Sequence, residues 1–385
     1  MLTPNIILKN FKININKTII KKKLQSIIDD EKNHIFQSLG KQYKYSYTLK
    51  QIKKYKKFLN FRVIGMGGSI LGTRAIYEFL NHKIKKKFLF VDNLQNTNKK
   101  FKKNNFVNLV VSKSGNTIET IVNSNILLKK KDKNIFITEN SKNYLHNFAE
   151  KMKSEIIHHN NFIGGRYSVL SEVGMLPAEL MGLKTDDFKQ FNSLIKNKKF
   201  LNCLVQSVTA TLFFIKNKKF NSVIINYDEK SENIFKWYQQ LVAESLGKKK
   251  KGLLPIVSNM PKDNHSVMQL YLDGFQNNFF TFFYVKDGDS VELNNKNLLS
   301  SHKYLKKKDL AKIIYAQKKA TENVFNKKNI PFRSFEIKKR NEKSLGELFT
   351  FFILETILLG KCLNLNPFDQ PAVELIKKQT NKILI

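Results

Sequence analysis

NLVVSKSGNTIETIV, residues Asn108 to Val122, is the stretch that decides the fold of this chain. It opens with an apolar run, Leu109 to Val111, which is typical of a short buried strand. The run breaks into a hydroxyl-rich turn over 112–117, and apolar residues then return at helical spacing at Ile118 and Ile121. The stretch therefore predicts a strand, a turn and a helix in succession.

The turn at 112–117 has two interpretations. Three hydroxyls and a glycine at the start of a helix suit a phosphate, because free backbone N–H groups and the positive end of the helix dipole lie there. The alternative is an ordinary capping box, with Asn116 or Thr117 as the cap and Glu119 or Thr120 in the first turn. This stretch alone does not decide between them.

A second glycine-rich turn, over 65–72, follows the predicted strand Phe61 to Ile64. A dinucleotide-binding motif needs G-x-G-x-x-G and an acidic residue about 20 positions later, which Gly65, Gly67 and Asp92 satisfy in part. Ile70 stands where the third glycine belongs, which weakens a dehydrogenase interpretation. Two phosphate-binding turns in one sheet instead favour a small phosphorylated ligand that contacts both.

Strands alternate with helices along the chain, which predicts α/β layers with parallel sheets. The alternation restarts near residue 200, after a polar, lysine-rich stretch, and this restart indicates a second α/β domain. Leu345 to Cys362 is apolar but carries three charged residues, so it predicts a buried core helix and not a membrane span. The predicted units are an N-terminal helical segment, a first domain, a second domain and C-terminal helices, at 1–55, 56–199, 200–343 and 344–385.

The formal charge of +37 raises the possibility of binding to nucleic acid or an anionic membrane. The lysines, however, recur as short runs along the whole chain, which favours a solvated surface over one binding patch. We therefore expect no specific nucleic-acid or membrane partner. Hydrophobic residues make up 42% of the chain, enough for a large core.

The cysteine content and the N-terminus indicate a reducing compartment. Cys203 and Cys362 are the only cysteines and lie in apolar surroundings, which suits reduced, buried thiols. The first residues, 1–23, lack the continuous apolar stretch of a secretory signal. We expect a cytoplasmic protein.

Six segments resemble sequence motifs of one enzyme family, in the order in which that family carries them. The first two are similar to the phosphosugar-binding loops of sugar isomerase domains in general, and the last four to motifs of glucose-6-phosphate isomerases. The segments are GMGGSILG (65–72), SKSGNTIET (112–120), GGRYS (164–168), QLVAESLGK (240–248), DNHSVMQ (263–269) and NPFDQPAVELIK (366–377).

The resemblance implies two three-layer αβα sugar isomerase domains with mainly parallel sheets. It also implies a reaction, the interconversion of glucose 6-phosphate and fructose 6-phosphate through a cis-enediol, without a metal or cofactor. Such a reaction needs a base that moves a proton between adjacent carbons and a group that stabilises the enediolate. Glu244 matches the family's base and Arg166 its enediolate-facing arginine. His265 and Lys377 match the pair that opens the sugar ring.

The remaining matches are to groups that bind substrate. Glu119 matches a residue that supports the phosphate loop. Ala372 stands where the family usually has glycine, and Met66 where isoleucine is common; neither change removes a group that the chemistry needs. The expected substrate-binding residues are Gly68, Ser69, Ser112, Lys113, Ser114, Thr117, Gln240 and Gln370.

The resemblance also bears on the assembly of the chain, and two other functions fit part of the sequence. The resemblance implies a homodimer in which His265 reaches the neighbouring site, while His158 and His159 lack metal-ligand spacing and are predicted to lie in a loop. One alternative is a sugar-phosphate isomerase that also accepts mannose 6-phosphate. The other is a sugar-phosphate-binding regulator that holds nucleic acid, which would need the two phosphate loops but not Glu244, His265 and Lys377.

Overall fold

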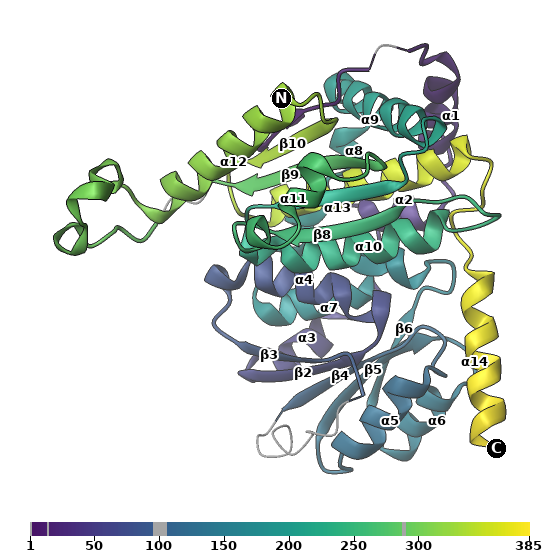
Figure 1. The fold of residues 1–385 in the computed structure, drawn as a ribbon. Helices are drawn as coiled ribbons and strands as arrows, with labels where there is room; N and C mark the ends of the chain where they lie inside the picture. Colours follow the sequence, from purple (N-terminus) through teal and green to yellow (C-terminus); the bar gives the residue numbers. More distant parts are fainter. Residues whose placement is uncertain (1, 14, 95–105, 287–289) are drawn as a thin grey trace.

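The computed structural model describes residues 2–13, 15–94, 106–286 and 290–385. It contains two five-stranded sheets (Figure 1). The first sheet is parallel throughout and has the order β3-β2-β4-β5-β6. Its strands are β2 (Asn60–Gly65), β3 (Lys87–Val91), β4 (Val107–Val111), β5 (Lys133–Glu139) and β6 (Glu155–His159).

The second sheet has the order β1-β10-β9-β7-β8, and only its edge strand β1 runs antiparallel to its neighbour. Strand β1 comes from the N-terminal segment, where the sequence analysis predicted helices alone. Its Ile6 and Leu8 are buried opposite Ile337 and Phe335, so a pairing with the far end of the chain decides their conformation. The strands are β1 (Ile6–Lys9), β7 (Asn221–Asn226), β8 (Leu254–Asn259), β9 (Asn278–Val285) and β10 (Phe332–Ile337).

Helices cover both faces of each sheet, so the predicted α/β class with two mainly parallel sheets is confirmed (Figure 1). The helices are α1 (Thr18–Ile28), α2 (His34–Leu39), α3 (Leu49–Lys56), α4 (Leu71–Phe79), α5 (Ile118–Leu127), α6 (Tyr144–Lys151), α7 (Glu172–Met181), α8 (Phe191–Leu194), α9 (Lys198–Lys216), α10 (Glu232–Leu246), α11 (Met268–Asp273), α12 (Leu310–Lys327), α13 (Glu342–Cys362) and α14 (Pro371–Leu384).

The main core lies between the two sheets, where α4, α7, α10 and α13 pack together (Figure 1). Every residue of α13 from Ser344 to Gly360 is buried, as predicted for the apolar stretch near the C-terminus. In the described part of the chain, no helix is both long and apolar enough to cross a bilayer. The last helix differs from the others, because α14 buries none of its residues.

The prediction that His158 and His159 lie in a loop is wrong. They are the last two residues of β6 and pair in register with Thr138 and Glu139 of β5. Three polar residues among the five of Glu155–His159 hide the strand from a search for apolar runs. The structure thus adds an edge strand to the first sheet.

Candidate active site

The turn after β2 packs against the loop that carries Arg166. Residues Gly67–Ser69 form a short 3-10 helix, η1, ahead of α4. A methyl group at Gly68 would lie 2.2 Å from the carbonyl carbon of Gly165, so only glycine permits this approach. Gly68, predicted to bind substrate, therefore sets the spacing between this turn and Arg166.

The turn after β4 lies beside the turn after β2. Strands β2 and β4 are neighbours, and their carboxyl ends meet at one edge of the sheet, where parallel α/β sheets bind ligands. The hydroxyls of Ser112 and Thr117 are 3.0 Å apart across the turn. Thr117 occupies the N-cap position of α5, yet among the described residues its side chain caps no backbone N–H. The capping-box interpretation is therefore wrong for this helix.

The turn 112–117 also carries an exposed hydroxyl and a half-buried ammonium that a ligand could contact. Gly115 has φ +64°, and a methyl group there would overlap Asn143, so the tight turn needs glycine. Ser114 is exposed and Lys113 is half-buried. Burial lowers the pKa of the Lys113 ammonium, and the nearby Glu139 carboxylate opposes that shift. An anion at this turn would favour the charged form of Lys113.

Arg166 connects the two halves of the chain. It is 2% exposed, and it lies in η4 (Gly165–Leu170), a 3-10 helix that leads into α7. Its Nη1 donates to Glu244 Oε2 at 3.1 Å and to Gln370 Oε1 at 2.9 Å. Its Nε donates to Ser245 Oγ at 2.8 Å. Its Nη2 donates to the carbonyls of Pro367 and Asp369, at 2.6 and 3.0 Å.

Glu244 stands on α10 with both carboxylate oxygens oriented. One oxygen faces Arg166, and the other accepts a hydrogen bond of 2.9 Å from Gln240 Nε2, one turn earlier on the helix. Its side chain is 30% exposed, so a substrate can still reach it. Among the described residues, Gln240 Oε1 is buried without a hydrogen-bond partner. This leaves an acceptor for a ligand hydroxyl next to the carboxylate.

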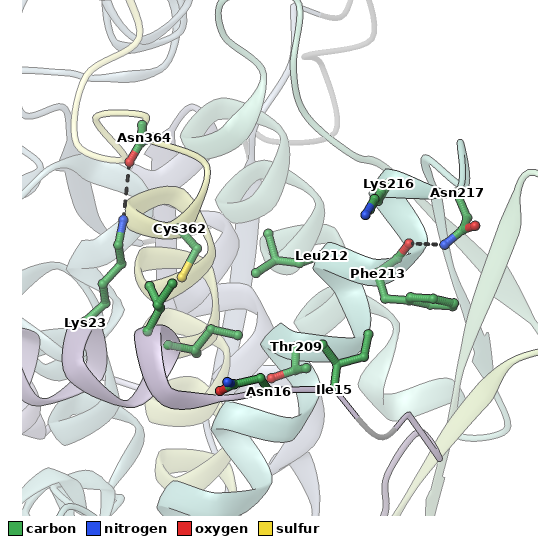
Figure 2. A pocket seen from close by; sticks show the side chains of 12 residues that line it. Ile15, Asn16, Lys23, Thr209, Leu212, Phe213, Lys216, Asn217, Cys362 and Asn364 are labelled. Carbon is green, nitrogen blue, oxygen red and sulfur yellow. Dashed lines mark hydrogen bonds between the residues drawn. The ribbon is translucent and has the colours of Figure 1, made fainter.

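A cavity of about 720 Å³ opens beside Glu244 and Gln370. Its other walls come from the start of α14 and from the lysine-rich turn 248–251. A second cavity, of about 750 Å³, lies between α1, α9 and the end of α13 (Figure 2). Its lining includes Ile15, Leu212, Phe213 and Cys362, so it is separate from the site around Arg166.

His265 and Lys377 lie apart from this group. His265 is exposed in η7 (Lys262–His265), a 3-10 helix after β8. Lys377 is exposed on α14 and pairs with Glu374 at 2.6 Å. Within the described residues, no hydrogen bond or ion pair links either side chain to Glu244 or Arg166. One copy of the chain therefore brings together Gly68, Arg166, Gln240, Glu244 and Gln370, with the 112–117 turn at the neighbouring strand end.

Comparison with known sequences matches residues 32–260 to the family described as phosphoglucose isomerase. The chain belongs to the phosphoglucose isomerase family. The predicted family and the predicted class of enzyme, an isomerase, are thereby confirmed. Among its relatives, the glucose-6-phosphate isomerase of Methanocaldococcus jannaschii is 32% identical over 362 residues, which cover 87% of this chain and 86% of that protein. The glucose-6-phosphate isomerase of Mycoplasmopsis pulmonis is 31% identical over 356 residues, covering 84% and 82%.

Solved structures show the same fold. A hypothetical protein from Thermus thermophilus superposes with a TM-score of 0.84 at 23% identity, covering 96% of this chain and 94% of that one. A glucose-6-phosphate isomerase from Chlamydia trachomatis gives a TM-score of 0.69 at 18% identity, covering 95% and 77%. The two-sheet architecture is thus that of the phosphoglucose isomerase family.

Two side chains outside the predicted site residues also hold Arg166 in place. Ser245 Oγ accepts from its Nε, and the buried Trp237 donates from Nε1 to its carbonyl at 3.1 Å. A signal for both was present, because Ser245 lies inside the motif 240–248 and Trp237 is the only tryptophan of the chain, two helical turns before Glu244. In the described ranges, no cluster of three or more His, Cys, Asp or Glu side chains could hold a metal ion.

The buried His159, on the edge strand of the first sheet, should make the free energy of unfolding depend on pH. It is 2% exposed, its Nδ1 lies 2.8 Å from the Asn160 carbonyl, and burial lowers its pKa from 6.5 to about 4. The unfolded chain therefore takes up a proton between pH 6.5 and 4 that the folded chain does not. We expect the free energy of unfolding to fall as the pH drops through this window, by up to about 3 kcal/mol.

Urea unfolding at about pH 7 and about pH 4.5 measures this effect. His159→Phe should lose that part of the pH dependence, whereas His158→Phe, at the exposed neighbouring position, should keep it. An identical pH slope in all three proteins would contradict the role of His159.

Proposed function

We propose that this chain interconverts glucose 6-phosphate and fructose 6-phosphate through a cis-enediol. The observation that carries the proposal is the contact between Arg166 Nη1 and Glu244 Oε2 at 3.1 Å, close to two turns suited to phosphate. A carboxylate and a permanently charged donor fork are the two groups that enolisation next to a carbonyl requires.

In the proposed reaction, Glu244 takes the proton from carbon 2 of the open-chain aldose. The C–H electrons form the C1–C2 double bond, and the C1 carbonyl electrons move onto oxygen 1, whose negative charge faces Arg166. The hydroxyl proton passes from oxygen 2 to oxygen 1, and Glu244 returns its proton to carbon 1, which yields the ketose. The hydrogen bond from Gln240 holds the carboxylate in place for both transfers.

The hydroxyls of Ser112, Ser114 and Thr117 hold the substrate phosphate in this proposal, with Lys113 adding positive charge and Ser69 lying on the adjacent turn. Because phosphate contacts bind substrate and transition state alike, they set KM more than kcat. Ser114→Ala combined with Thr117→Ala should therefore raise the KM for fructose 6-phosphate by about tenfold and leave kcat within about threefold. Steady-state kinetics measures both constants.

The double variant has a matched control on the same helix. Ser124→Ala changes a buried hydroxyl of α5 away from the turn, and it should leave KM unchanged. If the double variant keeps the KM of the unchanged protein, the phosphate binds elsewhere.

We propose that ring opening requires His265 and Lys377 and that His265 is supplied by a second copy of the chain. Both side chains are exposed in a single copy, which supports this arrangement. Gel filtration with sedimentation measures the assembly, and an active monomer would refute it. The boundaries 1–55, 56–199, 200–343 and 344–385 remain part of the proposal.

A coupled assay that converts fructose 6-phosphate to glucose 6-phosphate tests the proposed reaction directly. The same assay with mannose 6-phosphate tests the broader alternative, and binding of fructose 6-phosphate without turnover would favour the regulator. We further propose that the enzyme serves glycolysis and gluconeogenesis in the cytoplasm, and its two free cysteines support that location.

A further inference from the structure

We propose that Lys189, a buried lysine outside every motif named above, is a positioning residue that holds Arg166 in its working orientation. This inference rests on the proposed function, because it assigns Lys189 to the arginine that faces the enediolate. It concerns the short helix η4, whose second residue is Arg166 and whose last residue is Leu170.

Lys189 anchors the end of η4. It directly follows η5 (Thr185–Phe188) and is 4% exposed. Its ammonium donates hydrogen bonds to two backbone carbonyls, those of Leu170 at the end of η4 and of Ser38 in α2. One side chain therefore joins the N-terminal segment to the helix that carries Arg166.

Aromatic rings and a carboxylate enclose the charge of Lys189. Its Nζ lies 5.1 Å from the ring centre of Tyr43 and 4.9 Å from that of Tyr45, distances at which a cation is attracted to an aromatic face. Glu172, two residues beyond Leu170, accepts a 2.9 Å hydrogen bond from Tyr43 Oη. Burial lowers the pKa of Lys189 to about 7, whereas the charges of Glu172 and Asp186 favour the ammonium.

The start of η4 is fixed by neutral contacts. Its first residue, Gly165, packs directly on Gly68, where a side chain would clash with the Gly165 carbonyl, and Trp237 donates to the Arg166 carbonyl. These contacts fix the start of η4, whereas Lys189 fixes its end. Without Lys189, two buried carbonyls would lose their donor, and the end of η4 would shift to find another.

A shift of η4 would turn the Arg166 guanidinium relative to Glu244. Reactions that depend on oriented groups lose about 100-fold in rate for a displacement of about 1 Å. The phosphate turns follow β2 and β4, and the contact of Gly68 with Gly165 at the start of η4 does not involve Lys189, so substrate binding would change little. The expected signature is a loss in kcat with an unchanged KM, measured on fully folded enzyme because an unfolded fraction also lowers the apparent kcat.

The test compares Lys189→Met with Lys318→Met in the fructose 6-phosphate assay. Lys318 is a second fully buried lysine, on α12, and it pairs with Glu322 at 2.9 Å, so its loss should destabilise the fold without reaching Arg166. At a temperature where both variants are folded, Lys189→Met should lower kcat by about tenfold or more with KM within about twofold. Lys318→Met should keep both constants.

A second readout does not depend on turnover. A phosphorylated aldonate, whose carboxylate imitates the enediolate, should bind Lys189→Met more weakly by about the factor lost in kcat, because transition-state mimics depend on the same oriented charge. If Lys189→Met does not fold, Lys189→Arg must show the same loss confined to kcat, since a guanidinium cannot occupy the place of Nζ between the two carbonyls. Equal kcat losses in the two methionine variants, or unchanged aldonate affinity, would overturn the inference. An inactive unmodified protein would instead overturn the proposed function.

Discussion

Glu244→Gln should bind fructose 6-phosphate with little change in KM but turn it over at least about 100-fold more slowly, the usual scale for loss of a general base. Glutamine has the same shape, so its Oε1 can accept from Arg166, and its Nε2 can donate to Gln240 once the Gln240 amide rotates to present its unpartnered Oε1. It cannot take up the proton from carbon 2. Steady-state kinetics in both directions measures the loss.

A matched control lies on the same helix. Glu232→Gln, in the first turn of α10, changes a carboxylate about three turns away from Glu244 and should leave kcat unchanged. Turnover by Glu244→Gln at the rate of the unchanged protein would refute the proposed base. A rise in KM alone would mean that Glu244 binds substrate without moving the proton.

Glu355→Gln should lower the free energy of unfolding by about 3–5 kcal/mol, the usual cost of leaving a buried charge without its partner. Arg333 of β10 is 3% exposed and donates through both terminal nitrogens to Glu355 of α13, with Nη2 to Oε2 at 3.0 Å. Its Nε donates to Thr281 Oγ1 of β9 at 3.0 Å. Removing the carboxylate charge leaves the guanidinium buried between the second sheet and the central helix.

Guanidinium chloride unfolding measures this change. Glu150→Gln, an exposed residue 3.6 Å from His146, is the control and should shift stability by less than about 1 kcal/mol. Arg333→Met combined with Glu355→Leu should recover most of the loss, because a packed apolar pair can replace a buried ion pair. A loss below about 1 kcal/mol in Glu355→Gln would show that the buried arginine finds another partner.

The elements predicted from sequence were those with continuous apolar runs. Strand β4 is covered on both faces, so every residue must be apolar or paired, and the pattern is visible locally. Strand β10 was missed because Arg333, Ser334 and Glu336 interrupt it. Their burial depends on partners such as Glu355, which only the folded chain brings near.

The candidate site, like the fold, could be predicted from the sequence only in part. The motifs named the residues that could contact substrate, and the structure brings five of them together, namely Gly68, Arg166, Gln240, Glu244 and Gln370. Part of the support for Arg166 was not predictable, because two of its bonds end on backbone carbonyls that carry no sequence signal. Lys189 is one of 68 lysines and arginines, and composition cannot distinguish a buried lysine from a solvated one.

The hydrogen bonds of Arg166 have a consequence for how the enzyme matures. Each side-chain bond from its guanidinium crosses from the first half of the chain to residues beyond 240. The contacts that orient the proposed catalytic pair are therefore also the contacts that fasten one half to the other. A newly synthesised chain cannot complete this site in stages, since Arg166 gains its partners only after residues 366–370 have been made and docked. The order of synthesis therefore makes docking of the two halves a condition for an ordered catalytic pair.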